Sequence, residues 1–301
     1  MINQILVRLN RVLFNRVAGA VLSTPPAHRG SAAFCALSMV HHRDVVPYLL
    51  AIKSFILYAG PARVVVVADP TLNAEDRAVL RQHVPHIEIL EAADFRRPAL
   101  PVGGTWERLA AISVLCADVS VVQLDADTLT LGPPIEVVSA LLVGRSFVVR
   151  SEAGVEIVDV STAAAEGRRR AESSNHVQVA AEACLPQLNP LESFRSARGC
   201  SGFTGFGRAH ISLALLTDVS AQFRALLRAR WDEWGTEQVT SNLLAASAPG
   251  AFMLPHPRYC NADSQAAETV LAHYIGYARF TSRAYERQAR QTIARLMGAA
   301  A

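Results

Sequence analysis

The sequence predicts an α/β protein in which helices cover both faces of a mostly parallel central sheet. Short apolar runs alternate along the chain with helical patterns, beginning near residue 33. These runs are apolar at successive positions instead of alternating with polar residues, which is typical of strands buried on both faces of a parallel sheet.

The elements follow one another from residue 33 to residue 124. The first helical pattern ends at Ala59-Gly60-Pro61, a strong stop signal. A β-branched run follows, and Asn73 then caps a helix whose first turn holds Glu75 and Asp76. We expect strands over residues 33–40, 64–67, 87–90 and 119–124, and helices over residues 46–58, 73–82 and 105–117.

Composition indicates a soluble globular protein. With 301 residues, 51% of them hydrophobic and 18% charged, the chain can bury a large core without disulfides. No linker or repeat divides it, so we expect one central domain over residues 31–280, with additions at residues 1–30 and 281–301. The cysteines are five, widely spaced and never in a CxxC pattern, which favours reduced thiols and a cytoplasmic setting. They are Cys35, Cys116, Cys184, Cys200 and Cys260.

Charge is unevenly distributed. The net charge of +3 is too small to indicate a nucleic-acid partner, and no basic helix interleaved with aromatics occurs. No acidic residue precedes Asp44, whereas five arginines do. On a helical projection of the first 22 residues, the apolar side chains gather opposite a polar, basic side. The apolar set is Ile2, Ile5, Leu6, Leu9, Val12, Leu13 and Val17; the polar set is Gln4, Arg8, Arg11 and Asn15.

Two interpretations of this N-terminal helix stay open. Arginines interrupt its apolar stretches, so it is neither a spanning helix nor a signal peptide. It could lie on an anionic surface, such as the inner face of the cell membrane, or pack its apolar side on the domain. The last 20 residues, where arginines alternate with apolar residues, predict a second surface helix.

Polar clusters follow three of the expected strands. The first strand leads into Ser38–Asp44, the second into Asp69, and the fourth into Asp125 and Asp127. The carboxyl ends of parallel strands form the ligand-binding edge of such a sheet. Asp125 and Asp127 are two residues apart, so their side chains point the same way and can share one hard cation. The alternative is that the two carboxylates only cap a turn.

Four segments resemble one enzyme group. VVQLDADTLTLGPPIEV, residues 121–137, resembles the strand and Asp-X-Asp loop of the GT-A glycosyltransferases. Residues 199–203 look like the small-residue turn that lines the donor sugar, and residues 237–242 resemble the acidic-Gln-xxx-Asn segment. HYIGYAR, residues 273–279, is similar to the His-xx-Gly-xx-Lys element of the glycogenin and galactosyltransferase group, family 8. The matches keep the family's order between residues 33 and 280.

This resemblance implies a GT-A fold in which residues 31–280 form the catalytic domain. It implies that the protein is a glycosyltransferase using a nucleotide-diphosphate sugar, a UDP-sugar by analogy, with Mn²⁺ or Mg²⁺. The metal would be held by Asp125, Asp127 and His273. Gly276 would let the backbone approach the phosphates, and Arg279 stands where the family has lysine and would offset the charge of the leaving diphosphate.

The resemblance also implies roles around the donor. Gln238 would lie near the anomeric carbon, and Glu237 would bind sugar hydroxyls or, in an inverting reaction, act as base. Ser201 and Gly202 would line the sugar. Ser38, Asp69 and Arg108 would lie near the nucleotide, although Asp69 before Pro70 also fits an ordinary turn and Arg108 also fits a solvated helix face.

The departures from family 8 bear on stereochemistry. Phe280-Thr281 replaces the family's proline and tryptophan, and Glu237 replaces an aspartate. A retaining reaction, by front-side displacement, rests on that membership. The acceptor stays open between a glycan, a lipid-linked sugar and a small molecule. Residues 151–198, with Arg168–Arg170, show no clear period and resemble the family's variable acceptor region; the arginines fit a solvated face or an anionic acceptor.

Three other functions stay open. A catalytically inactive scaffold would keep the fold without activity. A sugar nucleotidyltransferase would need a glycine-rich loop, which Ser38–Asp44 does not provide. A metal-dependent hydrolase would show more clustering of histidine and aspartate than the nine dispersed histidines here.

Overall fold

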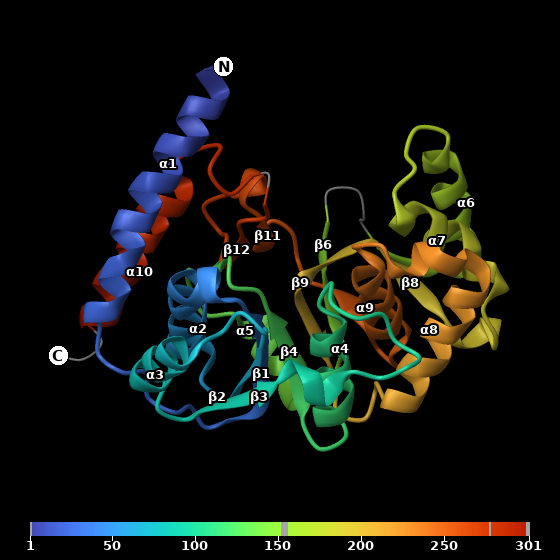
Figure 1. Cartoon of the computed structure of the whole chain (residues 1–301), viewed down its shortest axis with the longest axis horizontal. Helices are drawn as coiled ribbons and strands as arrows, with labels where there is room; N and C mark the ends of the chain where they lie inside the picture. The colour runs from blue at the N-terminus through green and yellow to red at the C-terminus, as the bar shows by residue number, and fades with distance from the viewer. Residues whose placement is uncertain (1, 152–155, 277, 299–301) are drawn as a thin grey trace. The chain divides into compact units, whose positions relative to one another are not determined.

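A computed structural model describes residues 2–151, 156–276 and 278–298 (Figure 1). The chain is an α/β protein with a mainly parallel sheet flanked by helices, so the predicted fold class is confirmed. Its internal contacts divide it into two compact units. The first comprises Met1–Leu90, Leu124–Val138 and Pro255–Ala301, and the second comprises Glu91–Gln123 and Ser139–Leu254.

In the first unit, three strands lie in the order β1-β2-β3. They are β1 (Ala32–Val40), β2 (Pro61–Ala68) and β3 (Ile87–Glu91), with α2 (Val45–Ala59) and α3 (Ala74–His83) between them. β1 and β2 are parallel, with Ala36 opposite Val64. α2 ends at Gly60, whose φ of 57° is left-handed. Asn73 and Asp76 form a capping box on α3, which confirms the predicted cap.

A second, three-stranded sheet in the same unit has the order β11-β12-β5. Its members are β11 (Tyr259–Asn261), β12 (Leu271–His273) and β5 (Thr128–Thr130). β12 is parallel to β11 and antiparallel to β5. The amide of Thr130 donates to Ser54 Oγ on α2 at 3.2 Å, which anchors β5. α5 (Ile135–Leu142) follows after two prolines.

The terminal helices of the first unit lie side by side, α1 (Ile2–Ala18) along α10 (Ala284–Gly298), as Figure 1 shows. The Phe14 ring stacks on Tyr285 with centroids 3.9 Å apart, and Asn10 Nδ2 donates to the Phe280 carbonyl at 2.9 Å. The structure therefore has a helix at each end of its described residues. Within the described residues, no helix has the length and apolar character needed to cross a membrane.

In the second unit, four strands lie in the order β10-β6-β9-β4. β6 pairs antiparallel with β9 and parallel with β10. The helices include the predicted α4, whose Trp106 packs edge-on against Trp231. The strands are β4 (Ser120–Leu124), β6 (Phe147–Arg150), β9 (Gly199–Phe206) and β10 (Phe252–Met253); the helices are α4 (Trp106–Leu115), α8 (Leu213–Leu227) and α9 (Thr236–Ser247).

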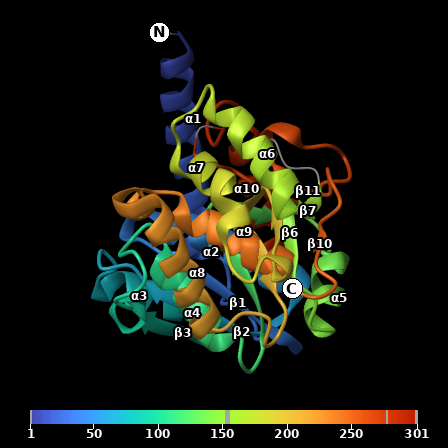
Figure 2. The same cartoon turned by 90° about the vertical axis from the view of Figure 1, so that its right-hand side faces the viewer.

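Residues 151–198, which showed no clear period, contain two helices that lie side by side (Figure 2). These are α6 (Val160–Ala171) and α7 (Val177–Cys184), next to the antiparallel pair of β7 (Ile157–Asp159) and β8 (Arg195–Ala197). Arg169 and Arg170 both pair with Glu166 on α6, at 2.6 Å each, and Arg169 is 68% exposed. A solvated face is therefore the better interpretation for Arg169, whereas Arg170 is only 19% exposed.

The remaining helical segments are short 3₁₀ turns. They cover Gly19–Ser23, His42–Asp44, Ala92–Phe95, Leu185–Gln187, Leu191–Ser193, Arg228–Asp232 and Ala262–Ser264. The five cysteines are all free thiols, as predicted, and all except Cys184 are buried.

Candidate functional site

The Asp-X-Asp turn begins where β4 ends. All five residues of β4 are buried, and Leu124 leads into a tight turn in which the Thr128 amide and hydroxyl both donate to the Asp125 carbonyl, at 3.2 and 2.9 Å. Asp127 is 7% exposed. The turn therefore holds both carboxylates in the first unit, at the start of β5.

His273 reaches this turn through strand pairing. In the β5–β12 ladder His273 lies opposite Thr128, and the Tyr274 amide donates to the Asp127 carbonyl at 2.8 Å. The His273 Nε2 atom lies 3.1 Å from Asp127 Oδ1. His273 is 4% exposed, so the imidazole is fixed in place.

Arg279 completes this cluster. Its guanidinium forms an ion pair with Asp127 Oδ2, and its Nε donates to the Tyr274 carbonyl at 3.1 Å. Burial acts to raise the pKa of Asp127, but the positive charges and hydrogen bonds of His273 and Arg279 outweigh it and hold that pKa well below its usual range. Asp127 is thus an ionised carboxylate at neutral pH.

The donor set fits a hard divalent cation. Asp125, Asp127 and His273 each offer a ligand atom, and these atoms lie within 4.8 Å of one another. Two carboxylates and one imidazole suit Mn²⁺, and Mg²⁺ accepts the same oxygens. Three protein ligands leave coordination positions for oxygens of another molecule.

Three further predicted residues lie in the first unit. Ser38 is fully buried, and its Oγ donates to the Leu124 carbonyl at 2.6 Å, just before Asp125. Asp69 accepts from the Thr71 amide at 2.9 Å and from His41 at 3.1 Å, which is the turn geometry considered for it. Burial acts to raise the pKa of Asp69, but Thr71 and His41 together lower it. A Cβ added at Gly276 would meet nothing within 4 Å.

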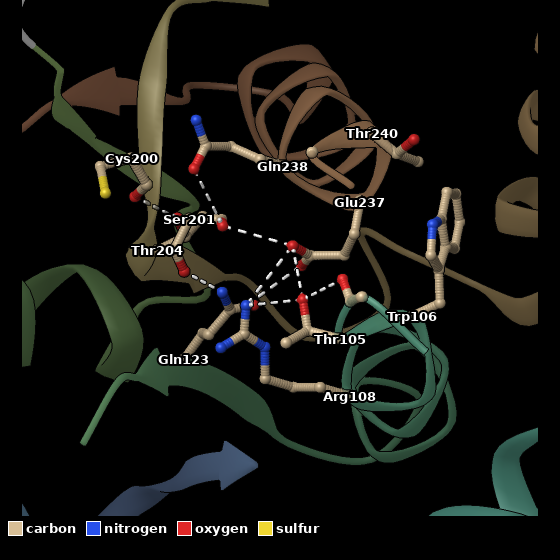
Figure 3. A network of polar contacts seen from close by, with 12 residues as sticks. Thr105, Trp106, Arg108, Gln123, Cys200, Ser201, Thr204, Glu237, Gln238 and Thr240 are labelled. Carbon is tan, nitrogen blue, oxygen red and sulfur yellow. Dashed lines mark hydrogen bonds and ion pairs between the residues drawn. The ribbon is translucent and has the colours of Figure 1, made fainter. Parts of the chain in front are cut away.

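The other predicted residues lie in the second unit. There Arg108 on α4 and Glu237 on α9 form an ion pair at 3.4 Å, as Figure 3 shows. Each is only 3% exposed, so a solvated helix face for Arg108 is excluded. Glu237 Oε2 also accepts from Thr105 Oγ1 at 3.0 Å and from Ser201 Oγ at 3.3 Å.

Ser201 and Gln238 belong to the same network. Gln238 Oε1 lies 3.4 Å from Ser201 Oγ, and the Ser201 carbonyl accepts from the Gln123 amide (Figure 3). Gly202, the next residue of β9, is buried. The structure therefore brings Arg108, Ser201, Glu237 and Gln238 together, in a cluster of hydroxyls, an amide and one charge pair.

Sequence reasoning missed Thr105. This residue has a left-handed φ of 71° at the start of α4 and follows two glycines that also have positive φ. The Gly103-Gly104 pair before a helix is the signal that would have indicated a special turn. Its geometry lets the hydroxyl reach Glu237, 132 residues away.

Comparison with known proteins supports the fold. No family model matches the sequence, and no curated protein sequence matches it. The structure resembles the apo WbbM bifunctional glycosyltransferase, with a TM-score of 0.54 and 13% identity over 88% of this chain and 50% of that one. The chain thus spans about half the length of that protein. At this identity the likeness shows the fold alone, and it agrees with the predicted GT-A arrangement.

Two further solved structures match less closely in space. Mouse xyloside xylosyltransferase 1 gives a TM-score of 0.47 and 12% identity, over 82% of this chain and 98% of that one. The galactosyltransferase LgtC, with donor and acceptor sugar analogs, gives 0.42 and 12%, over 88% and 96%.

Proposed function

We propose that the chain is a metal-dependent glycosyltransferase that takes a sugar from a nucleotide-diphosphate donor. The observation that carries this proposal is the convergence of Asp125, Asp127 and His273 within 4.8 Å, at the end of a buried strand of a GT-A-like fold. Bound Mn²⁺ or Mg²⁺ would supply Lewis-acid stabilisation of the leaving diphosphate.

The first unit provides the groups that such a donor needs. Asp125, Asp127 and His273 hold the cation, while the Arg279 guanidinium, 26% exposed beside Asp127, offsets negative charge on the diphosphate. Gly276 allows the backbone close to the phosphates, since its surroundings are open. Asp69 and Ser38 are proposed to lie near the nucleoside part of the donor. Ser38 would act indirectly, because its Oγ donates a hydrogen bond to the Leu124 carbonyl.

The second unit provides groups suited to sugar hydroxyls. Glu237 already accepts from Thr105, Ser201 and Arg108, which fits a binding role better than that of a general base. We therefore favour a retaining transfer, in which Gln238 lies beside the anomeric carbon and the diphosphate accepts the proton of the acceptor hydroxyl. Membership of the glycogenin and galactosyltransferase group, and UDP as the nucleotide, are parts of this proposal.

Nucleotide binding is the first test. We would measure the melting temperature with UDP, GDP, CMP and dTDP, each with and without Mn²⁺. A ligand at about 100 times its Kd adds roughly 2.7 kcal/mol to the free energy of unfolding, a rise of several degrees for a chain of this size. We expect one diphosphate to give that rise, and only with Mn²⁺.

Variants assign this effect to the metal cluster. Asp125→Asn/Asp127→Asn keeps the shape of both side chains and should abolish the rise, whereas Asp118→Asn, at an exposed aspartate shortly before the turn, should leave it unchanged. No shift with any nucleotide in folded protein would overturn the transferase proposal in favour of an inactive scaffold. Nucleoside triphosphates, measured in the same way, test the alternative enzyme class, since a rise with them alone would favour a nucleotidyltransferase.

The acceptor stays open among three classes of molecule. A glycan, a lipid-linked sugar and a small molecule all offer the hydroxyl that the reaction needs. Incubating the protein with UDP-sugar and Mn²⁺ and following UDP release, with each acceptor class added in turn, would discriminate among them. The anomeric configuration of the product, read by NMR, tests retention.

A further inference from the structure

The side of α1 that faces away from α10 carries a continuous apolar stripe. Ile5, Leu9 and Val12 are 62%, 51% and 63% exposed, and their spacing of four and three residues places them on one face of the helix. Leu6 beside them is 48% exposed. Isolated exposed apolar residues are ordinary, but several in register on one helix indicate an interaction surface.

α1 packs on the first unit with a different side from the one that carries the apolar stripe. Phe14 and Asn10 are 2% and 7% exposed and face α10, where Phe14 stacks on Tyr285. The apolar stripe is thus not part of the core of this unit. Of the two interpretations of the N-terminal helix, packing of the apolar side on the domain does not hold for Ile5, Leu9 and Val12.

Positive charge gathers on this pair of helices. α1 carries three arginines and no acidic residue, and α10 carries three arginines and Glu286. The two helices therefore have a net charge of +5, whereas the whole chain has +3, which leaves −2 for the remaining residues. Glu286 itself is buried and held by Arg283 and Arg290. The outward field of the pair is strongly positive.

An open groove lies between α1 and α10, beside the stripe. It has a volume of about 600 Å³ and is lined by Leu13, Val17 and Ile293 together with Arg16, Arg290 and the Glu286 carboxylate that pairs with Arg290. Arg16 is four residues beyond Val12, so it continues the exposed stripe. An apolar floor with guanidinium groups beside it matches the chemistry of a phospholipid, whose phosphate adjoins apolar chains.

We propose that this face of α1, with the adjoining groove, docks on the surface of an anionic lipid bilayer. Ile5, Leu9 and Val12 enter the boundary between headgroups and acyl chains, and the arginines bind lipid phosphates. A second copy of the chain is a poorer occupant, because two helix pairs that each carry a net charge of +5 repel. This proposal does not depend on the glycosyltransferase activity.

Sedimentation with vesicles tests the proposal. The full chain is mixed with vesicles of phosphatidylcholine alone, or with about one third phosphatidylglycerol, and the bound fraction is measured. We expect binding to the anionic vesicles, little binding to the neutral ones, and weakening at high salt. Failure of folded protein to bind anionic vesicles would overturn the proposal, whatever its nucleotide binding.

Paired variants locate the surface. Ile5→Glu/Leu9→Glu should lower the partition coefficient about tenfold or more for each apolar side chain lost from the bilayer. Ile135→Glu/Val143→Glu changes two equally exposed apolar residues elsewhere, at 64% and 72%, and should have no effect. Melting temperatures confirm that both proteins fold. Equal losses in the two variants, or a dimer in sedimentation velocity that only the α1 variant disperses, would contradict lipid docking.

Discussion

Asp127 Oδ1 lies 3.1 Å from His273 Nε2, although 146 positions separate the two residues along the chain. They meet because β5 pairs antiparallel with β12, which sets His273 opposite Thr128. The ladder fixes both backbones, so the carboxylate and the imidazole are positioned before any ligand arrives. A metal site that is organised in this way loses little entropy on binding.

His273→Ala should weaken Mn²⁺ binding by about ten- to a hundredfold, because a buried nitrogen ligand is lost while both aspartates remain. Calorimetric titration of Mn²⁺ in the presence of UDP measures the change. His28→Ala, at an exposed histidine of the same unit, is the control and should bind as the unchanged protein does. Equal affinity in the His273 variant would remove this residue from the metal site.

The strands up to residue 124 could be predicted because each is a short apolar run bounded by a clear turn signal. The same holds for α3, whose capping box is local in sequence. The nearness of His273 to Asp127 came instead from family resemblance, since a three-residue strand such as β12 has no pattern of its own. The contact of Thr105 with Glu237 depends on a left-handed turn and on tertiary packing, which local patterns do not encode.

Two segments show where periodicity stops being informative. α6 and α7 are short and rich in alanine, so few large apolar side chains mark their buried sides. For α1, the helical projection of the sequence identified an apolar side, but it could not show which side of the helix packs against the rest of the protein. Phe14 decides this, because its stacking on Tyr285 belongs to tertiary structure.

Lys53 is the only lysine of the chain and should make stability depend on alkaline pH. Burial lowers its pKa from 10.5 to about 8 in the folded protein, where Nζ also donates to the Pro25 carbonyl at 2.6 Å. Between those two pH values the unfolded chain holds a proton that the folded protein has lost. The free energy of unfolding should therefore rise with pH over that window, by up to about 3 kcal/mol.

Urea unfolding of the protein and of Lys53→Met across this pH range isolates the contribution of Lys53. The variant should lack the rise, whereas other groups that titrate there are common to both proteins. Selective isotope labelling of lysine gives one NMR signal, so the pKa can be read directly. A titration midpoint near 10.5, or identical slopes in both proteins, would show that burial does not perturb Lys53.

Removing only one member of the buried Arg108–Glu237 ion pair should destabilise the folded protein. Glu237→Leu leaves a guanidinium 3% exposed without its carboxylate and should lower the free energy of unfolding by about 3–5 kcal/mol. The double variant Arg108→Met/Glu237→Leu should recover much of that loss, because no unpaired charge remains. Denaturant unfolding of the two single variants and the double variant gives the coupling; strict additivity would mean that the pair does not interact.

Substitution by alanine should affect stability differently at Gly276 and at Gly199. A Cβ at Gly199 would lie 2.7 Å from Asn242 Oδ1 and 2.9 Å from the Val149 carbonyl, so Gly199→Ala should cost about 1–3 kcal/mol of stability. A Cβ at Gly276 meets nothing within 4 Å, so Gly276→Ala should melt as the unchanged protein does.

If Gly276 lies against the donor phosphates, the same methyl group should weaken UDP binding with Mn²⁺ by about tenfold, since it fills space that the ligand needs. Stability and affinity would then be separated by two substitutions of the same kind. Melting curves and calorimetric titrations of both variants provide the comparison. Unchanged affinity in Gly276→Ala, with the expected loss of stability in Gly199→Ala, would place the phosphates away from Gly276 and leave the metal cluster as their anchor.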